Sequence, residues 1–408
     1  MNQTDPSDPP EAVPSGRAHR LGLALAVRLA LGPAVALGLA RFAYALLLPS
    51  MRAELNWSFT TAGAINTANA MGYLAGALLA AQIARRTGAR RAFVTGLAVT
   101  VVSLAATGAT DNVIALAAVR ALSGVSGAIC FITGAGLVAE GAGSISAPRV
   151  ASLLGIYFAG GGAGIVVSGL AIPPLLAAAP AAVGWRWGWF LLGVLGAVGF
   201  VFAAPAARAS REPPVSGATE KGWPARRLGT MLIGYGLFGA GYIAYMTFIV
   251  AFLKSQGAGP GEVTVFWVLL GTASIGGAFA WAYPIAALRG GRGPSLVLAV
   301  VSTGALLPLL SRSPAAAMGS AVLFGGSFLA VVTAVTVVAR RSLQPKHWTP
   351  AIAALTVAFA LGQCIGPLVA GRVSDGPAGL SDGLGLSVAL LLGGALLALG
   401  QRHHDPIP

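Results

Sequence analysis

Apolar segments long enough to cross a bilayer alternate with short polar connections along the chain. A membrane-spanning helix needs about 20 predominantly apolar residues, and clusters of polar residues, proline and glycine separate such segments here. The predicted helices cover residues 27–50, 59–84, 91–110, 112–139, 150–176, 186–206, 228–253, 262–287, 294–311, 315–339, 350–371 and 384–401. This pattern predicts an all-α membrane protein with twelve transmembrane helices.

The polar connections divide the chain into two halves. The longest connection lies at 207–227, between the sixth and seventh predicted helices, and leaves six helices on each side. We therefore expect two six-helix bundles, at 21–206 and 228–401, joined by a cytoplasmic loop. A disordered tail at 1–20 and a short tail at 402–408 complete the predicted organisation.

The two halves resemble each other in sequence. A shift of 201 residues places G38-L-A-R-F-A-Y44 over G239-A-G-Y-I-A-Y245. Bundles of the same orientation, related by an axis along the membrane normal, are a known transporter architecture. The repeat therefore predicts that the two six-helix bundles are pseudo-symmetric.

Composition and charge narrow the class of protein further. Hydrophobic residues make up 56% of the 408 positions and charged residues only 9%, whereas an ordinary soluble domain has about 25% charged residues. The net charge of +14 would suit a nucleic-acid partner, but the basic residues form short clusters between apolar segments rather than a stripe. We expect a lipid bilayer and no nucleic acid as partner.

Arginine and lysine are distributed unequally between the two sets of loops. With the N-terminus inside, the inner segments carry 18 of the 26 basic side chains, the outer segments 5 and the predicted helices 3. Positively charged loops stay preferentially in the cytoplasm. The distribution therefore predicts a multi-pass protein with both termini in the cytoplasm.

Arg41 and Arg120 interrupt apolar segments near the middle of the bilayer. Arg41 lies about nine residues, or roughly 13 Å, from the outer end of the first predicted helix, and Arg120 lies about eight residues into the fourth. A charge at this depth costs at least ~2.5–3.5 kcal/mol unless water or a partner meets it. Each arginine is either a clamp on neighbouring helix carbonyls or a ligand for a solute in a cavity.

Uncharged polar residues occur at the same depth. They are either groups that shape a solute site or residues that join neighbouring helices by hydrogen bonds and packing. The candidates for solute binding are Arg41, Tyr44, Asn66, Asn69, Arg120, Tyr242, Tyr245 and Gln363.

Acidic residues are missing from the middle of the predicted helices. Asp111, Glu140, Glu262 and Asp375 all fall at or near helix ends. Two central arginines without a carboxylate leave a positive charge that a small anion would neutralise through charge-assisted hydrogen bonds. If protons are moved, Glu140 near the inner mouth is the remaining carrier, although a solvated loop residue is the alternative interpretation.

The residues that usually carry chemistry do not form a catalytic cluster. Cys130 and Cys364 lie in apolar surroundings, which indicates buried thiols. The four histidines lie in the tails or in one loop. We therefore expect no metal, no cofactor and no enzymatic activity.

Three motifs resemble those of the major facilitator superfamily (MFS). The stretch R85-R-T-G-A-R-R91 is similar to that family's G-x-x-x-D-R-x-G-x-R-R loop, and R120-A-L-S-G-V-S-G127 resembles its arginine motif in helix 4, which is linked to proton or substrate movement. The first-helix pattern G-x-x-R-F-x-Y-x-x-L-L-P-x-M resembles the bacterial YbfB/YjiJ-like branch. The resemblance covers residues 21–401 and implies the twelve-helix MFS fold in a bacterial cytoplasmic membrane.

The resemblance also implies a set of gating residues. In the family, the Asp of the loop motif belongs to a latch at the cytoplasmic gate, but Arg85 stands in its place here. The latch is therefore lost, or it uses backbone carbonyls at a helix end. Helix 11 contains G362-Q-C-I-G-P-L-V-A-G371, which is similar to part of the family's antiporter motif. The gating candidates are Arg86, Gly88, Arg90, Arg91, Gly366 and Pro367.

These features predict a transporter, either secondary active or facilitative. We expect it to move a small anionic organic solute by alternating access, through a cavity among helices 1, 4, 7 and 10. We expect a monomer whose partners are the solute and, if transport is coupled, protons. Two alternatives are a proton-driven exporter of a hydrophobic compound and a non-transporting receptor or assembly partner.

Overall fold

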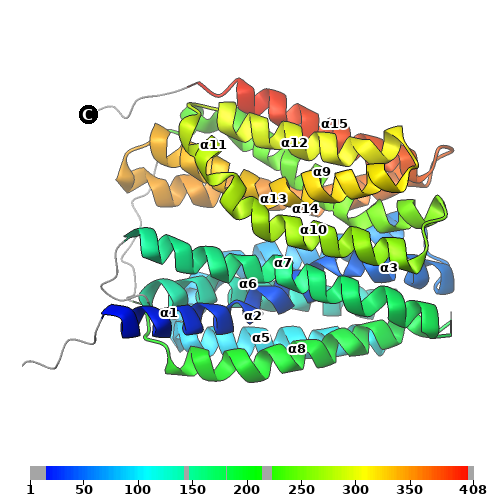
Figure 1. Ribbon diagram of the computed structural model, residues 1–408, viewed down its shortest axis with the longest axis horizontal. Coiled ribbons are helices and arrows are strands. Elements are labelled where there is room, and N and C mark those ends of the chain that lie inside the picture. The colour runs from blue at the N-terminus through cyan, green and yellow to red at the C-terminus, as the bar shows by residue number, and fades with distance from the viewer. Residues whose placement is uncertain (1–14, 142–146, 181, 214–222, 403–408) are drawn as a thin grey trace, which may run out of the picture.

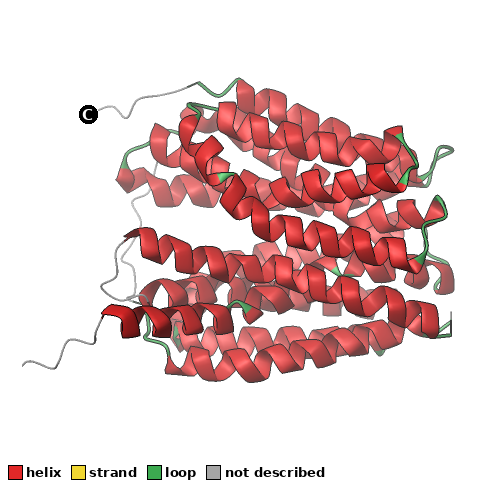
Figure 2. Cartoon of the chain, viewed as in Figure 1, coloured by secondary structure: helices red, strands yellow, loops and turns green. Residues whose placement is uncertain are grey.

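The computed structural model describes residues 15–141, 147–180, 182–213 and 223–402, and these residues are almost entirely helical (Figure 2). The helices are α1 (Ser15–Leu29), α2 (Leu31–Pro33), η1 (Ala34–Phe42), α3 (Tyr44–Glu54), α4 (Phe59–Thr87), α5 (Ala89–Gly108), α6 (Val113–Gly141), α7 (Ala147–Ala178), α8 (Gly184–Ala209), η2 (Ala225–Leu228), α9 (Gly229–Ser255), α10 (Pro260–Ala280), α11 (Ala282–Ala287), α12 (Arg292–Leu310), α13 (Pro314–Ser342), η3 (Pro345–His347), α14 (Trp348–Ser374) and α15 (Leu380–Leu399).

The expected tails and central loop fall partly outside the described residues. These unplaced parts are residues 1–14 of the N-terminal tail, 214–222 of the central loop and 403–408 of the C-terminal tail. The remaining part of the N-terminal tail differs from the prediction, because α1 already begins at Ser15. The helix therefore continues beyond the apolar segment into the polar residues before it.

Twelve segments of the described chain have the length of a membrane span. Eleven of them are also apolar enough to qualify by composition, and the first runs continuously over Gly22–Glu54 through α1, α2, η1 and α3. The twelfth is α4, whose polar residues lower its hydropathy but whose 29 residues exceed the about 20 that a span needs. The predicted all-α membrane fold with twelve helices is confirmed.

The first span is not the uniform α-helix that the sequence predicts. Pro33 has no backbone N–H to donate, and the chain forms a π-helix from Ala34 to Phe42 directly after it. At its end, the N–H of Ala43 donates to the carbonyl of Gly38, five residues earlier, at 3.0 Å. Such π-helical turns frequently occur at functional sites, and Arg41 lies on this one.

The helices form two groups that lie one above the other in Figure 1. Helices α1–α8 form the N-bundle and α9–α15 form the C-bundle, and the bundles meet where α4 packs against α14, α7 against α10, and α3 against α9. We call the end at which α1 begins and α15 ends the terminal face (left in Figure 1) and the opposite end the distal face.

Small residues allow the first span to pack tightly inside the N-bundle. A Cβ atom on Gly164 of α7 would collide with the carbonyl oxygen of Ala34 and with the Cα atom of Gly38. A Cβ atom on Gly160 would likewise collide with the backbone carbonyl of Ala30. Glycine at these positions lets α7 hold the π-helical segment at backbone-to-backbone distance.

This packing predicts that Gly164→Ala destabilises the fold. The added methyl group must push η1 away from α7, and overpacking of this kind costs about 1–3 kcal/mol. The melting temperature of the detergent-purified protein is therefore expected to fall. Gly161→Ala is the matched control, because its Cβ would sit 3.6 Å from Leu37 Cδ1, an ordinary contact. Equal melting temperatures for the two variants would contradict the prediction.

Candidate functional site

Arg41 links the two bundles near the middle of the molecule. Its side chain is only 4% exposed, and its Nη2 donates a hydrogen bond to Oε1 of Gln363 on α14. Gln363 Nε2 in turn donates to the hydroxyl of Tyr242 on α9 at 2.9 Å. The guanidinium also lies over the ring of Tyr73 on α4, 4.8 Å from its centroid. Three of the predicted site residues are therefore joined in one chain of hydrogen bonds.

Arg120 lies inside the N-bundle and is fully buried. Its Nη1 donates to the carbonyl of Ala40 on η1. Its guanidinium lies over two aromatic rings, 5.3 Å from the centroid of Tyr44 and 5.0 Å from that of Trp189 on α8. All of these partners belong to the N-bundle. Arg120 therefore clamps the carbonyl next to Arg41 and faces away from the C-bundle.

The four remaining predicted residues make four different contacts. Asn69 Nδ2 donates to the Arg120 carbonyl at 3.0 Å, so α4 also holds the arginine's own helix. Asn66 Nδ2 crosses to the C-bundle and donates to Thr247 Oγ1 at 2.6 Å. The Tyr245 hydroxyl instead bonds Ser320 within the C-bundle. The last of the predicted residues, Tyr44, donates to the Ala62 carbonyl at 2.8 Å.

Several residues near the arginines were not predicted from the sequence. Tyr73, Trp189 and Thr247 contact Arg41, Arg120 and Asn66 respectively. For Tyr73 a signal was present, because residues 66, 69 and 73 lie on one face of a helix. For Trp189 and Thr247 the sequence holds no comparable signal, since their contacts depend on how distant helices pack.

The buried arginines keep hydrogen-bonding capacity that the protein does not use. Arg41 Nε and both Nε and Nη2 of Arg120 are buried without a hydrogen-bond partner. The two ion pairs among the described residues, Arg90 with Glu212 and Arg186 with Asp111, do not involve either central arginine. Because unsatisfied buried donors are costly, this centre is suited to a negatively charged or strongly accepting ligand.

On the distal face, Asp375 connects the end of α14 to the beginning of α4. Its carboxylate accepts hydrogen bonds from the backbone N–H groups of Phe59 (2.7 Å) and Thr60 (3.0 Å) and from the Thr60 hydroxyl (2.6 Å). These are free N–H groups of a helix N-terminus, where a negative charge is favoured. Arg52 stacks over the Phe59 ring beside them, at 3.8 Å.

The surroundings of Asp375 stabilise its ionised form. Burial alone would raise the pKa of this carboxyl, but the hydrogen bonds from Thr60 and Phe59 and the charge of Arg52 lower the pKa below its usual value. The C-bundle therefore presents a persistent negative charge to the N-terminus of α4 in the N-bundle. We call this set of contacts the distal latch.

On the terminal face, charged groups fasten loops within a single bundle. Glu212 accepts from Arg90 Nε at 2.8 Å and from the Ala89 N–H at 2.8 Å at the start of α5. Burial would raise the pKa of Glu212, but the hydrogen bonds from Arg90 and from the backbone of Ala89 and Arg90 lower it overall. Gly88, with φ at +85°, makes the turn before α5.

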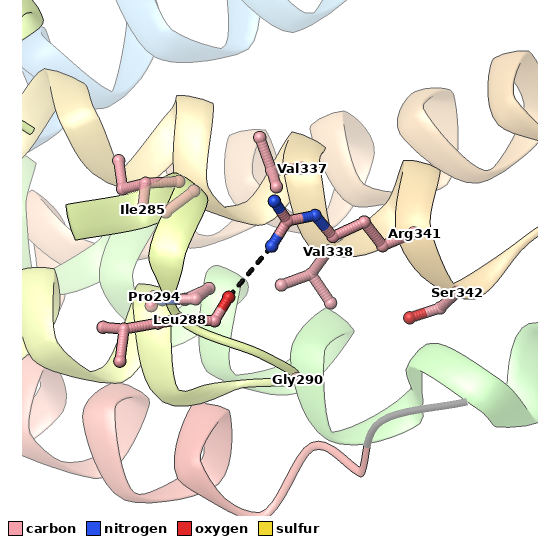
Figure 3. Close-up of a pocket in the computed structure, with 10 residues that line it drawn as sticks. Ile285, Leu288, Gly290, Pro294, Val337, Val338, Arg341 and Ser342 are labelled. Atoms are coloured by element: carbon pink, nitrogen blue, oxygen red, sulfur yellow. Dashed lines mark hydrogen bonds between the residues drawn. The ribbon is translucent and has the colours of Figure 1, made fainter. Parts of the chain in front are cut away.

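The C-bundle fastens its corresponding loop in a different way. Arg341 of α13 donates to the carbonyls of Leu288 (2.9 Å) and Ala286 (2.8 Å) at the end of α11. Figure 3 shows this side chain reaching across a small pocket lined by Ile285, Pro294 and Val337. An arginine thus holds backbone carbonyls at a helix end here, but it does so within the C-bundle.

The predicted gating residues lie in two places. Arg86, Gly88, Arg90 and Arg91 lie around the α4–α5 turn on the terminal face. In α14, Gly366 packs against the Ala240 backbone of its own bundle, whereas the Pro367 carbonyl faces Gly63 of the N-bundle. Their contribution to gating stays a prediction.

Two six-helix bundles that meet at one interface are the architecture of the MFS fold, and solved structures show the same arrangement. The nucleoside transporter NupG has 13% identity over 92% of this chain and 98% of its own, with a TM-score of 0.71. A bacterial homolog of the human lysosomal transporter Spinster, inward-facing and occupied, has 17% identity over 96% and 97%, with a TM-score of 0.73. At such identities the likeness shows the fold alone.

The sequence profile of the family described as "Uncharacterised MFS-type transporter YbfB" matches residues 33–401. The chain therefore belongs to this family of MFS transporters, which confirms the resemblance drawn from its motifs and the expectation of a non-enzymatic protein. No curated protein sequence matches the chain.

The contacts of Arg120 predict that it is more important for stability than Arg41. Arg120→Ala removes a charged hydrogen bond to Ala40, which alone is typically worth about 1.5–3 kcal/mol, and empties the space between Tyr44 and Trp189. Its melting temperature in detergent should fall well below that of Arg41→Ala. The prediction is wrong if Arg41→Ala is the less stable of the two variants.

Proposed function

We propose that this transporter moves a small organic anion, which binds to Arg41 between the two bundles. The observation that carries the proposal is the state of the Arg41 guanidinium. It is buried, no carboxylate among the described residues pairs with it, and its Nη2 bonds only the neutral amide oxygen of Gln363 while Nε bonds nothing. Nε and Nη2 lie on one edge of the guanidinium.

A carboxylate fits that edge better than the amide does. Its two oxygens accept from both donors in the parallel bidentate arrangement that makes arginine–carboxylate pairs strong, whereas the single amide oxygen satisfies one donor. The solute anion therefore replaces Gln363 at Arg41 and frees its side chain. In this proposal Arg120 positions the Ala40 carbonyl and hence the arginine beside it. The other polar residues of the predicted site shape its surroundings.

Alternating access accounts for the uneven distribution of contacts between the bundles. The inter-bundle hydrogen bonds of the described residues run from Arg41 and Asn66 at mid-depth to the distal latch. The ion pair of Glu212 and the carbonyl contacts of Arg341 on the terminal face remain within one bundle. This pattern supports a conformation closed at the distal face. With the terminal face in the cytoplasm, as the loop charges predict, this conformation is inward-facing.

The proposal predicts that anions stabilise the purified protein through Arg41. A ligand that binds only the folded state raises the melting temperature by mass action, so a panel of small carboxylates should contain stabilisers. Arg41→Ala should abolish this effect. Arg312→Ala, which removes an exposed arginine from the distal face, should retain it. Stabilisation of the Arg41→Ala variant by the same carboxylates would disprove the proposal.

A second variant tests the same site without removing the arginine. Gln363→Glu places a carboxylate of the protein beside Arg41, so the internal anion competes with the solute. We expect this variant to keep or raise its melting temperature without ligand and to lose stabilisation by carboxylates. A Gln363→Glu variant that binds carboxylates as well as the wild type would contradict the proposed position of the solute.

The distal latch predicts the effect of Asp375→Asn on conformation. The amide keeps the shape of the side chain but loses the negative charge at the α4 N-terminus, so the distal face should open more often. Spin labels at Ala182→Cys and Ala315→Cys, exposed positions on the distal side of the N-bundle and the C-bundle, would then report longer distances. The labelled background requires replacement of Cys130 and Cys364.

A control variant and the pH dependence of the label distances test whether the Asp375 charge holds the distal face closed. Asp111→Asn breaks an ion pair with Arg186 on the same face but inside the N-bundle, and should leave the label distances unchanged. Because the pKa of Asp375 is lowered, the latch keeps its charge above the ordinary aspartate pKa of about 3.9 and loses it only as the pH falls through the lowered value. Opening between pH 8 and pH 5 in the wild type would show that another group controls the latch.

A further inference from the structure

Six aromatic rings of the C-bundle form a nearly parallel stack beside the proposed anion site. They come from α9, α13 and α14, and we call them the aromatic array: Tyr235, Phe238, Tyr242, Phe324, Phe328 and Phe359. Among the described residues, the ring pairs with stacked geometry all belong to this array, with interplanar angles between 8° and 21°. The other ring pairs of the described residues are tilted or edge-on.

The array is connected to Arg41 through Gln363. Tyr242 accepts the hydrogen bond from Gln363, the residue that bonds the Arg41 guanidinium, and its ring stacks with those of Phe238 (5.0 Å) and Phe359 (5.6 Å). From the N-bundle, Phe42 meets the array edge-on at Phe328, with 6.0 Å between centroids. A single side chain, that of Gln363, therefore separates the array from the Arg41 guanidinium.

The rings of the array differ in how far they are buried. The array rings of α9 and α13 are at most 5% exposed, whereas Phe359 of α14 is only partly buried. Tyr73, the ring under the Arg41 guanidinium, is also only partly buried. Phe359 and Tyr73 come from opposite bundles, so the partly buried rings at this site belong to both sides of the interface.

We propose that the solute is an aromatic carboxylate. Its carboxylate binds the Nε and Nη2 edge of Arg41, and its ring stacks in an offset arrangement on Phe359, the partly buried ring of the array. Aromatic pairs add free energy beyond area burial when they are stacked in this way. An aliphatic acid of equal charge gains the guanidinium contact but not the stacking. This inference rests on the proposed function and adds the class of the anion.

Two acids of the same charge and similar size test this proposal. Benzoate and cyclohexanecarboxylate differ mainly in the planarity and π-system of the ring, and their affinities for the purified full-length protein follow from thermal-shift titrations. The energy of one stacked pair predicts that benzoate binds the wild type about 3- to 10-fold more tightly. Arg41→Ala should bind neither acid.

Variants of the array separate stacking from general packing. In Phe359→Leu, benzoate and cyclohexanecarboxylate should bind with about equal affinity, because the stacking contact is lost. The affinity of this variant for cyclohexanecarboxylate should stay within about 2-fold of the wild-type value. Phe359→Met serves the same purpose if the leucine variant does not fold. Phe279→Leu replaces a phenylalanine of α10 that is 66% exposed, and should keep the wild-type ratio.

The outcomes distinguish this inference from the proposed function. Equal, Arg41-dependent affinities for both acids in the wild type would overturn the aromatic preference and leave the anion site intact. Binding of neither acid, together with no stabilisation by the wider carboxylate panel, would overturn both. A wild-type preference for benzoate that persists in Phe359→Leu would also overturn the inference, because the array would then not be its source.

Discussion

The buried positive charge of Arg41 is the constraint on which the interface between the bundles depends. A guanidinium at this depth must be met by acceptors, and the protein supplies an amide oxygen from the opposite bundle instead of a carboxylate. The bond therefore holds the bundles together at mid-depth without neutralising the charge. A permanent ion pair would be a stronger link, but its carboxylate would compete with the anion that we propose to bind there.

The two central arginines are both buried, but they have different contact partners. Both interrupt apolar segments at similar depth, and the sequence predicts the same alternatives for each. The structure gives Arg120 only partners in the N-bundle, including two aromatic faces, whereas Arg41 reaches the C-bundle. Depth follows from counting residues along a helix, but the direction of a side chain depends on the rotation of that helix against its neighbours.

Most of the fold could be predicted because each span needs its own apolar run. The π-helix of the first span could not, since its apolar pattern differs little from that of an α-helix and only Pro33 marks its beginning. The distal latch was missed for another reason. Asp375 falls at a helix end, where an acidic residue is ordinarily solvated, and its partner α4 lies more than three hundred residues earlier in the chain.

The distal latch places a carboxylate on the opposite face from the aspartate of the family's loop motif. Arg85 occupies the position at which the terminal-face motif would carry an aspartate, so a carboxylate is missing from the end of α4 on that face. On the distal face the relationship is inverted, because a carboxylate at the end of α14 meets the beginning of α4. The carboxylate on the distal face favours contact between the bundles there. In the proposed mechanism, the binding free energy of a solute at Arg41 must offset this preference before the distal face can open, which would couple solute occupancy to the exchange between the two conformations.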